Sequence, residues 1–570
     1  MKPLEPAIVF DHFGFRYEAQ TEPTLVDINL TIFKGEKVLL LGPSGSGKST
    51  LGSVINGLIP HYYKGAVTGT CHVNGMEVQD AAVKDRHGCV GTVLQDSDAQ
   101  FVALSVGEDI AFALENKNMP RAEMLPMVAQ AASLVGMQDK LNHLPYELSG
   151  GQKQKVALAG VLHGKVDILL FDEPLASLDP KAGMEAMDLI ENLRNNLDVT
   201  TLIIEHRLED VLYRPVDRII VLNAGRVVAD GKPHDILKSR ILRQYGIREP
   251  LYISALMELA PDCPLPEGAL DSLDALDLSP YCAALTDFTG AQETRPPSAT
   301  GDPAVTVEGV SFAYEDSPVL SEISFTLRRG ERVALMGENG AGKSTLARLL
   351  CGVERPQQGK ILWEGEDYTA LSIAQLAQKI GYVMQNPNQM LVKDIVGQEV
   401  RLALDLRRVP KKEADRRVKQ ALTLTGLFPM RNWPIGALSY GQKKRVTIAV
   451  MLALEPSILI LDEPTAGQDF AHYTEMMTFV ETLSQTNRMA VLFITHDLHL
   501  ALEYTERAIL LSHGKILSDG DTFDLLCNET LLEQASLKKT SLMRLAQRLN
   551  LDPAKFVRRF MAFERGQRHG

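Results

Sequence analysis

Short, almost uninterrupted apolar runs recur along the chain and predict buried strands. In the first half they occupy residues 36–42 (EKVLLLG), 167–174 (DILLFDEP) and 201–206 (TLIIEH). Continuous apolar runs of this kind suit parallel strands that are covered on both faces of a sheet. The matching runs of the second half are ERVALMG (331–337), SILILDEP (457–464) and AVLFITH (490–496).

Helical segments lie between these runs. Residues 49–58 and 344–353 each follow a glycine-rich loop and are predicted to be helices, as are the longer segments 121–137 and 411–427. Strands that alternate with helices predict an α/β fold, with a largely parallel sheet core and a helical subdomain in each half. Each half also opens with a strand-like segment, AIVFDHFGFRY (7–17) or AVTVEGVSFAY (304–314).

The two halves are copies of one domain. Each contains a glycine-rich loop, a glutamine after a strand, a serine-containing loop before a basic helix, an Asp-Glu pair and a histidine, in that order. From the glutamine onward the spacing is identical in both halves. A tandem duplication explains this pattern, and each copy is long enough to bury its own core. The first copy contains Gln95, Ser149, Asp172 and His206, and the second contains Gln385, Ser439, Asp462 and His496.

The glycine-rich loops GPSGSGKST and GENGAGKST fit the P-loop pattern G-x-x-x-x-G-K-[ST]. Backbone N–H groups of such a loop wrap nucleotide phosphates, the lysine reaches the β- and γ-phosphates, and the serine hydroxyl holds Mg²⁺. The N-terminus of the helix that follows also favours anions. We therefore expect ATP to bind at Gly42, Pro43, Ser44, Gly45, Ser46, Gly47, Lys48, Ser49 and Thr50, and at Gly337, Glu338, Asn339, Gly340, Ala341, Gly342, Lys343, Ser344 and Thr345.

An Asp-Glu-Pro motif ends one apolar strand in each half, as Asp172-Glu173 and Asp462-Glu463. The first carboxylate suits Mg²⁺ coordination, shared with the P-loop serine, and the second can polarise a water that attacks the γ-phosphate. An acidic strand end alone is common, so this interpretation depends on the P-loop that precedes it. We expect ATP and Mg²⁺ as cofactors, with Ser49, Gln95, Asp172, Ser344, Gln385 and Asp462 as metal ligands.

His206 and His496 follow apolar strands, and their matched spacing indicates a sensor of the γ-phosphate in each half. Gln95 and Gln385 follow strands in VLQD and VMQN, where an amide could contact Mg²⁺ and the attacking water. With Glu173 and Glu463, these four residues are the predicted catalytic set. The prediction for the glutamines rests wholly on the repeat.

The segments LSGGQ (148–152) and LSYGQ (438–442) each precede a basic helix. Their serines could be helix N-caps, or the helix N-termini could bind a phosphate. Spacing does not decide which P-loop each segment would serve.

Composition limits the class of partner and the cellular location that we expect for the chain. The net charge of −13 argues against nucleic acid as the main partner. No apolar run approaches the roughly 18 residues of a membrane span, and the first ten residues lack the form of a signal peptide. We expect a cytosolic chain whose membrane role depends on a partner. The six cysteines show no C-x-x-C pairing, which favours reduced thiols.

The composition along the chain also suggests where its domains begin and end. We expect a first ATPase domain over 1–246, an acidic, proline-containing linker over 247–302, a second ATPase domain over 303–527 and a basic helical tail over 528–570. From Ala535 to Gly570 there are nine Lys and Arg residues against two acidic ones. A helix that packs one apolar face on its own domain is expected there, with anionic lipid or a partner subunit as the alternative.

Nearly the whole chain resembles the ABC ATPases, because the P-loop, the glutamine loop, the LSGGQ-type signature, the Asp-Glu motif and the histidine appear in order, twice. In that family two domains pair head to tail, and Tyr17 and Tyr314 match the aromatic residue that stacks on adenine. Tyr440 departs from the family pattern by replacing a signature glycine. By this resemblance, Lys48, Ser49, Gln95, Asp172, Glu173 and His206 would work with Ser439, Gly441 and Gln442, and Lys343, Ser344, Gln385, Asp462, Glu463 and His496 would work with Ser149, Gly151 and Gln152.

The segments around the glutamines, and GLIPHYYKGAVTG and EHRLEDVL in the first half, are similar to energy-coupling-factor (ECF) importer ATPases for cobalt, nickel or vitamins such as thiamine precursors. The resemblance implies a peripheral protein on the cytoplasmic side of the membrane. Its partners would be a transmembrane coupling subunit and a separate membrane substrate-binding subunit.

Two alternatives differ from this reading. In fused sugar-importer ATPases one site is commonly degenerate, whereas both halves here keep full motifs. Soluble tandem ABC ATPases of the ribosome carry an iron–sulfur domain or a long charged helical linker, and this chain shows neither.

Overall fold

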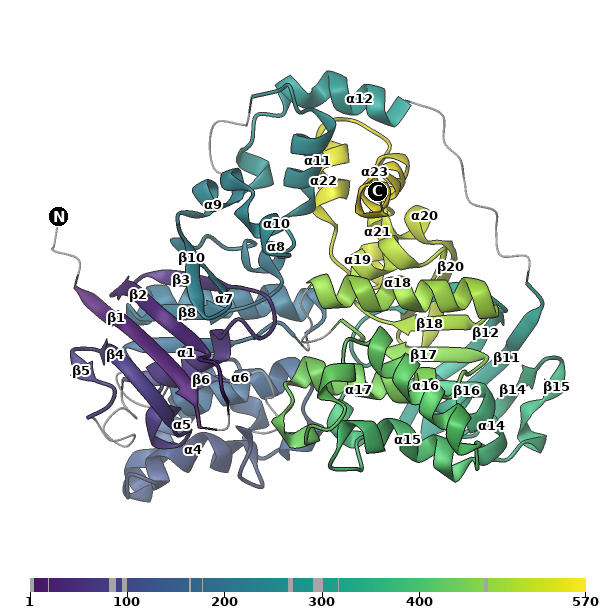
Figure 1. Ribbon diagram of the computed structural model, residues 1–570, viewed down its shortest axis with the longest axis horizontal. Coiled ribbons are helices and arrows are strands. Elements are labelled where there is room, and N and C mark those ends of the chain that lie inside the picture. Colours follow the sequence, from purple (N-terminus) through teal and green to yellow (C-terminus); the bar gives the residue numbers. More distant parts are fainter. Residues whose placement is uncertain are drawn as a thin grey trace. The chain divides into compact units, whose positions relative to one another are not determined.

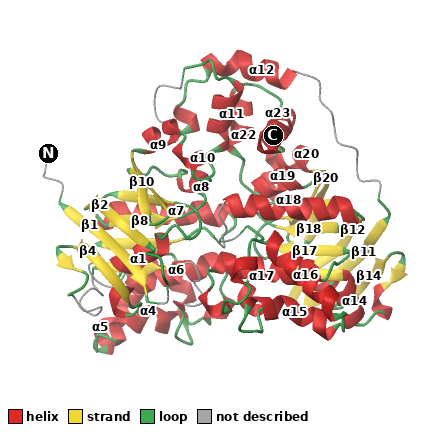
Figure 2. Ribbon diagram, viewed as in Figure 1, coloured by secondary structure: helices red, strands yellow, loops and turns green. Residues whose placement is uncertain are grey.

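The computed structural model describes residues 5–18, 20–80, 89–94, 100–162, 166–176, 178–264, 270–290, 301–315, 317–465 and 470–569. The chain divides into two compact units (Figure 1). The first comprises Met1–Met257 with Asp262–Leu278, and the second comprises Glu258–Pro261 with Ser279–Gly570. Each unit contains helices and strands of one α/β architecture (Figure 2).

The first unit is built on two sheets. A four-stranded antiparallel sheet has the order β2-β1-β4-β5, and a six-stranded sheet has the order β10-β9-β3-β8-β7-β6. All neighbours in the larger sheet are parallel except β10 and β9. The strands are β1 (Pro6–Tyr17), β2 (Leu25–Phe33), β3 (Lys37–Leu41), β4 (Gly65–Val73), β5 (Met76–Glu77), β6 (Val90–Val93), β7 (Ile168–Asp172), β8 (Thr200–Ile204), β9 (Arg218–Asn223) and β10 (Arg226–Gly231).

The central strands of the larger sheet are buried along their whole length, as their apolar runs predict. All five residues of β3 and all five of β8 are buried. One core packs both sheets against helix α1 (Lys48–Ile55), which supplies Leu51, Val54 and Ile55. The helical subdomain contains α4 (Val106–Glu115), α5 (Arg121–Leu134) and α6 (Gly150–Val161), and α7 (Pro180–Leu197) follows β7.

The second unit repeats this arrangement. Its sheets have the orders β12-β11-β14-β15 and β16-β17-β18-β13-β19-β20. The strands are β11 (Pro303–Tyr314), β12 (Ser317–Arg328), β13 (Arg332–Met336), β14 (Gln358–Trp363), β15 (Glu366–Asp367), β16 (Ile380–Val383), β17 (Ile458–Asp462), β18 (Ala490–Ile494), β19 (Arg507–Ser512) and β20 (Lys515–Asp521). Its main helices are α13 (Lys343–Leu350), α15 (Val396–Leu406), α16 (Lys411–Leu424), α17 (Tyr440–Ala453) and α18 (Phe470–Asn487).

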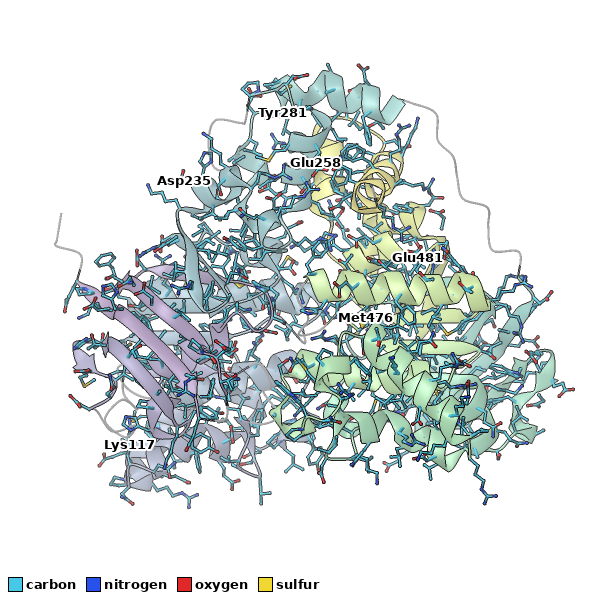
Figure 3. All side chains as sticks on the ribbon, viewed as in Figure 1. Lys117, Asp235, Glu258, Tyr281, Met476 and Glu481 are labelled. Carbon is cyan, nitrogen blue, oxygen red and sulfur yellow. The ribbon has the colours of Figure 1, made fainter. Side chains whose placement is uncertain are left out.

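A buried cation begins the central strand of each larger sheet. Lys37 on β3 donates to Glu191 on α7 at 2.7 Å. Arg332 on β13 pairs with Glu481, which Figure 3 labels on α18, and with Glu506. Removing one partner of such a pair would be strongly destabilising, because it would leave an uncompensated buried charge.

The segment predicted as a linker contains two helices, α11 (Leu251–Leu259) and α12 (Cys282–Gly290). The first six residues of α11 are buried. In α12, the Phe288 ring lies edge-on to Phe556 and Phe563 of α23 (Pro553–His569), with ring centroids 6.4 and 6.0 Å apart. The apolar residues of the tail are also buried: Leu537, Leu542, Leu545, Leu549 and Phe556. Among the described helices, none is both long and apolar enough to cross a membrane.

Candidate ATP sites

Each P-loop turns at a left-handed glycine directly before its helix. Gly47 has φ 102° and caps α1, and Gly342 has φ 99° and caps α13. A Cβ on Gly47 would lie 2.9 Å from Leu25 Cδ2, and one on Gly342 would lie 2.6 Å from Leu320 Cδ2. The left-handed conformation therefore favours glycine at this turn, where a side chain would also have to displace a leucine methyl group. The turn leaves the N-terminal N–H groups of the helix facing the loop, where a phosphate can bind.

The P-loop lysines point back into their own loops. Lys48 Nζ donates to the carbonyl oxygens of Gly42 and Pro43 at 2.7 and 3.0 Å. Lys343 Nζ donates to Gly337 and Glu338 at 2.8 and 2.7 Å. Both ammonium groups thus lie inside the concave face of the glycine loop, where phosphate oxygens can replace carbonyl oxygens as acceptors.

A hydroxyl and a carboxylate come together in each unit. Ser49 Oγ lies 3.4 Å from Asp172 Oδ1, and Ser344 Oγ lies 3.2 Å from Asp462 Oδ2. These hard oxygen donors fit Mg²⁺, which binds through one or two carboxylates together with substrate phosphates. Burial, and then the charge of Glu173, raise the pKa of Asp172 to about 6. Burial, and then the charge of Glu463, likewise raise the pKa of Asp462.

Each glutamate of the Asp-Glu pair meets its histidine. Glu173 Oε1 lies 3.1 Å from His206 Nε2, and Glu463 Oε1 lies 2.7 Å from His496 Nδ1. Both glutamates adopt positive φ, 51° at Glu173 and 45° at Glu463. Such strain in a non-glycine residue costs on the order of 1–3 kcal/mol and is found most often at functional sites. Both units therefore bring the glutamate and the histidine into contact, and their roles in ATP hydrolysis stay predictions.

The two glutamate environments differ at the residue before the histidine. In the second unit, Thr495 Oγ1 donates to Glu463 Oε2 at 3.2 Å. Burial would raise the pKa of Glu463, but the charge and hydrogen bond of His496 outweigh it and lower that pKa. In the first unit, Glu205 is the corresponding residue and is only 2% exposed. Burial, and then the charge of Glu173, raise the pKa of Glu205 to about 8.

Both signature serines are helix N-caps. Gln152 N donates to Ser149 Oγ at 3.4 Å, and Ser149 N donates to Gln152 Oε1 at 3.0 Å. Ser439 and Gln442 form the same capping box at 3.3 and 2.9 Å. A capping box satisfies two N–H groups of the first turn, and the remaining ones stay available to a ligand. Gly151 and Gly441 lie in these first turns.

Of the two predicted glutamines, the structure describes only Gln385. Gln95 lies outside the described residues. Gln385 is exposed, and its backbone carbonyl accepts from Tyr440 Oη at 3.1 Å and from Lys444 Nζ at 2.9 Å. Sequence patterns did not indicate Lys444, nor Tyr382, whose hydroxyl donates to Asp462 Oδ2 at 3.0 Å.

The tyrosines predicted to stack on adenine lie beside the P-loop helices. Tyr17 Oη is 3.2 Å from Thr50 Oγ1, and its ring lies edge-on to Tyr63 at 6.2 Å. Tyr314 is 37% exposed, and its hydroxyl accepts from Arg348 Nη1 at 3.3 Å. Their stacking on a nucleotide stays a prediction.

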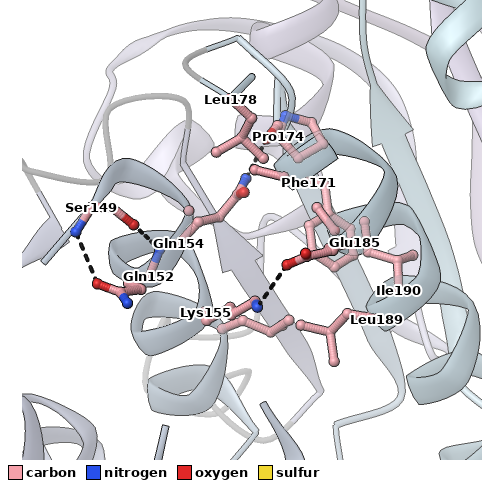
Figure 4. A pocket seen from close by; sticks show the side chains of 14 residues that line it. Ser149, Gln152, Gln154, Lys155, Phe171, Pro174, Leu178, Glu185, Leu189 and Ile190 are labelled. Atoms are coloured by element: carbon pink, nitrogen blue, oxygen red, sulfur yellow. Dashed lines mark hydrogen bonds and ion pairs between the residues drawn. The ribbon is translucent and has the colours of Figure 1, made fainter. Parts of the chain in front are cut away.

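A cavity of about 200 Å³ lies between α6 and α7 of the first unit (Figure 4). Ser149 and Gln152 line one end, and Leu189 and Ile190 line the apolar part. In the second unit, Met476 and Phe479 occupy the positions that correspond to Ala186 and Leu189. Met476 is buried in the core, and Phe479 packs against it.

Comparison with known proteins identifies related families. The family profile described as ABC transporter matches residues 25–176 and 320–466, more than half of the chain. A second profile, described as ATP-binding cassette cobalt transporter, matches residues 239–312.

Full-length relatives are found in several bacteria. A putative ABC transporter ATP-binding protein of Enterococcus faecalis is 50% identical over 99% of this chain and 100% of its own length. A putative ABC transporter ATP-binding protein of Lactiplantibacillus plantarum is 49% identical over 99% of this chain and 100% of its own length. The structure of cbiO1 from Clostridium perfringens, described as part of the ABC transporter complex cbiONQ, is 31% identical. The match covers 43% of the present chain and 99% of the cbiO1 chain, with a TM-score of 0.39.

The two profile matches coincide with the two P-loop units, which confirms the predicted P-loop α/β fold and its duplication. The domains of this family bind and hydrolyse ATP. The chain therefore belongs to the ABC transporter family, as an ATPase that carries two of its ATP-binding domains in tandem.

Proposed function

We propose that the chain is the energy-coupling ATPase of an ECF-type importer that takes up a vitamin, a thiamine precursor, or cobalt or nickel ions. The observation that carries this proposal is the match of residues 239–312 to a profile described for cobalt transporters. The resemblance of the glutamine-loop segments to ECF ATPases supports it.

Each ATP site would use the same set of groups. The P-loop and its lysine bind the phosphates, Ser49 with Asp172 or Ser344 with Asp462 would hold Mg²⁺, and Gln95 or Gln385 would complete the metal site. Bound Mg²⁺ would neutralise charge on the β- and γ-phosphates. Glu173 and Glu463 are suited to take a proton from the attacking water, since each carboxylate contacts its histidine and is shielded from solvent, fully at Glu463 and partly at Glu173.

Family resemblance further suggests that the domains pair head to tail, so that each signature segment completes the opposite site. The Lys48 site would then need Ser439, Gly441 and Gln442, and the Lys343 site would need Ser149, Gly151 and Gln152. In this proposal, E463Q leaves only the Lys48 site active, and E173Q leaves only the Lys343 site active. Ser439→Ala should therefore slow the ATPase of the E463Q chain much more than that of the E173Q chain. The opposite preference would contradict head-to-tail pairing.

The partners expected are a transmembrane coupling subunit and a small membrane protein that binds the substrate, with this chain peripheral on the cytoplasmic side. The test is a gentle detergent pull-down of the tagged chain from native membranes, followed by mass spectrometry. A multi-span protein together with a small integral protein supports the proposal, and the small protein would reveal the substrate class. Ribosomal proteins in their place, or a chain found wholly in the soluble fraction, would refute it.

A further inference from the structure

Lys444 on α17 is a fully buried lysine whose ammonium group has three acceptors. Its Nζ donates to the carbonyl oxygens of Met384, Gln385 and Asp462 at 2.7, 2.9 and 2.8 Å. The residue is 0% exposed. An ammonium group has three N–H donors, so its hydrogen-bonding capacity is fully used. Burial lowers the pKa of Lys444 to about 8, although Asp462 and Glu463 act in the opposite direction.

The three carbonyl groups come from two separate segments. Met384 and Gln385 follow β16 and begin the glutamine loop, whereas Asp462 ends β17 and precedes Glu463. A buried ammonium group that lost one of these acceptors would carry an unsatisfied charged donor at high energetic cost. The lysine therefore constrains the glutamine loop and the Asp462-Glu463 segment to move together.

Tyr440 adds a second contact from the same helix, one turn before Lys444. Its hydroxyl donates to the Gln385 carbonyl at 3.1 Å. This is the tyrosine that departs from the family signature, and both contacts start from the helix that Ser439 caps. Two side chains of the signature helix thus converge on one carbonyl of the glutamine loop.

The first unit has different residues at these positions. Gly150 corresponds to Tyr440 and has no side chain, and Gln154 corresponds to Lys444. Gln154 Nε2 donates to the carbonyl of Pro174 at 2.5 Å, beyond the Asp172-Glu173 pair (Figure 4). A neutral amide offers two donors rather than three. Gln154 of the first unit can therefore serve as the control against which the contribution of Lys444 is measured.

We propose that Lys444, assisted by Tyr440, is a positioning residue that holds Gln385 in register with Asp462 and Glu463 and links both to the signature helix α17. The inference rests on the proposed role of Gln385 in ATP hydrolysis. It gives the second domain a rigid connection between its own catalytic groups and the signature segment that is proposed to serve the other ATP site.

Kinetics test this role in the full chain carrying E173Q, so that turnover reports the Lys343 site. We expect Lys444→Met to lower kcat roughly 10- to 100-fold, since a small displacement of a catalytic group has effects of this size. The KM for ATP should change by less than about threefold, because the P-loop contacts are untouched. Lys444→Arg should recover part of kcat, and Lys444→Gln should lie between Met and Arg.

The matched control is Gln154→Met in the E463Q chain, where we expect a smaller loss of kcat than Lys444→Met causes. A kcat within about twofold of the parent for Lys444→Met, or an equal loss with Lys444→Arg and Lys444→Met, would overturn the proposal. If Lys444→Met does not fold, kcat of Lys444→Gln is compared with that of Lys444→Arg instead.

Hydrogen–deuterium exchange of the full chain separates this inference from the proposed function, because it needs neither a transport partner nor hydrolysis. Lys444→Met should speed exchange in residues 384–393 while residues 337–350 keep the parental rate. Unchanged exchange over 384–393 would refute the constraint even if ATPase activity fell. An inactive E173Q parent with faster exchange in Lys444→Met would count against independent hydrolysis at the Lys343 site and support the constraint.

Discussion

Glu463 and His496 are connected through both the backbone and the side chain of the histidine. The His496 N–H donates to Glu463 Oε1 at 3.1 Å, and ring Nδ1 lies 2.7 Å from the same oxygen. In the first unit, His206 approaches Glu173 through Nε2 at 3.1 Å, and its N–H donates instead to Glu205 Oε2 at 3.2 Å. The two candidate bases are therefore held differently, although their motifs are spaced identically.

Replacing the proposed bases should remove hydrolysis at the chemical step. We expect Glu173→Gln and Glu463→Gln each to slow turnover at its own site by roughly 10²–10⁴-fold, as loss of a general base does. The double variant should lose ATPase activity by that factor while it still binds ATP, as measured by phosphate release and by equilibrium binding of a fluorescent ATP analogue. Normal phosphate release from the double variant would show that these glutamates are not the bases.

The serine hydroxyls should matter through the metal. Ser344→Ala in the E173Q chain should raise the Mg²⁺ concentration needed for half-maximal ATPase activity by roughly tenfold or more, on the scale of losing a group that supports a metal site. Ser344→Thr keeps a hydroxyl and should stay close to the parent. Equal Mg²⁺ dependence of the Ala and Thr variants would argue against a metal role for Ser344.

Glu205 should make stability depend on pH. Its folded-state pKa is raised from 4.5 to about 8, so the folded chain retains a proton that the unfolded chain releases over this interval. The stabilisation is complete below about pH 4.5 and is lost as the pH rises through about 8. Glu205→Gln should therefore show a smaller fall in Tm between about pH 5 and pH 8 than the parent.

The control for this titration is Glu185→Gln, which changes a carboxylate that is 52% exposed. It should keep the parental dependence of Tm on pH. If Glu205→Gln also keeps it, the buried carboxyl is not the group that titrates.

The cavity beside α6 predicts that a methionine can be added at position 186 of the first unit, whereas its counterpart Met476 cannot be removed without loss of stability. Met476 is 1% exposed in the second core, so Met476→Ala should cost about 2–5 kcal/mol of stability. Ala186→Met places the same side chain beside the first unit's cavity of about 200 Å³, where it can be accommodated. Calorimetry of the full chain should show a fall of several degrees for the former. A comparable fall for Ala186→Met would show that the cavity cannot accept a side chain.

Apolar patterning was sufficient to predict the central strands of the two larger sheets and several of the helices. The run at residues 36–42 became β3, and the run at 457–464 became β17, because fully buried parallel strands leave no polar alternation to confuse the pattern. The glycine loops and the Asp-Glu pairs were predictable for a related reason. Backbone turns and strand ends are local, so a short motif specifies them.

Contacts between distant segments were not predictable. Lys444 is one of several basic residues in a helix that looks solvated by composition, yet it is wholly buried. Glu205 differs from Thr495 in the sequence, but its burial against Glu173 depends on two neighbouring strands. The helices α11 and α12 were missed because acidic and proline-rich neighbours obscured two short apolar segments.

Glu173 and Glu463 both occupy a backbone conformation that glycine adopts with little strain. At these two positions, a relaxed backbone and the proposed role as a catalytic base favour different residues. Drift toward greater robustness would replace the glutamates with residues that cannot accept a proton. A chain selected only for heat resistance would therefore tend to lose these two proposed bases while keeping its fold.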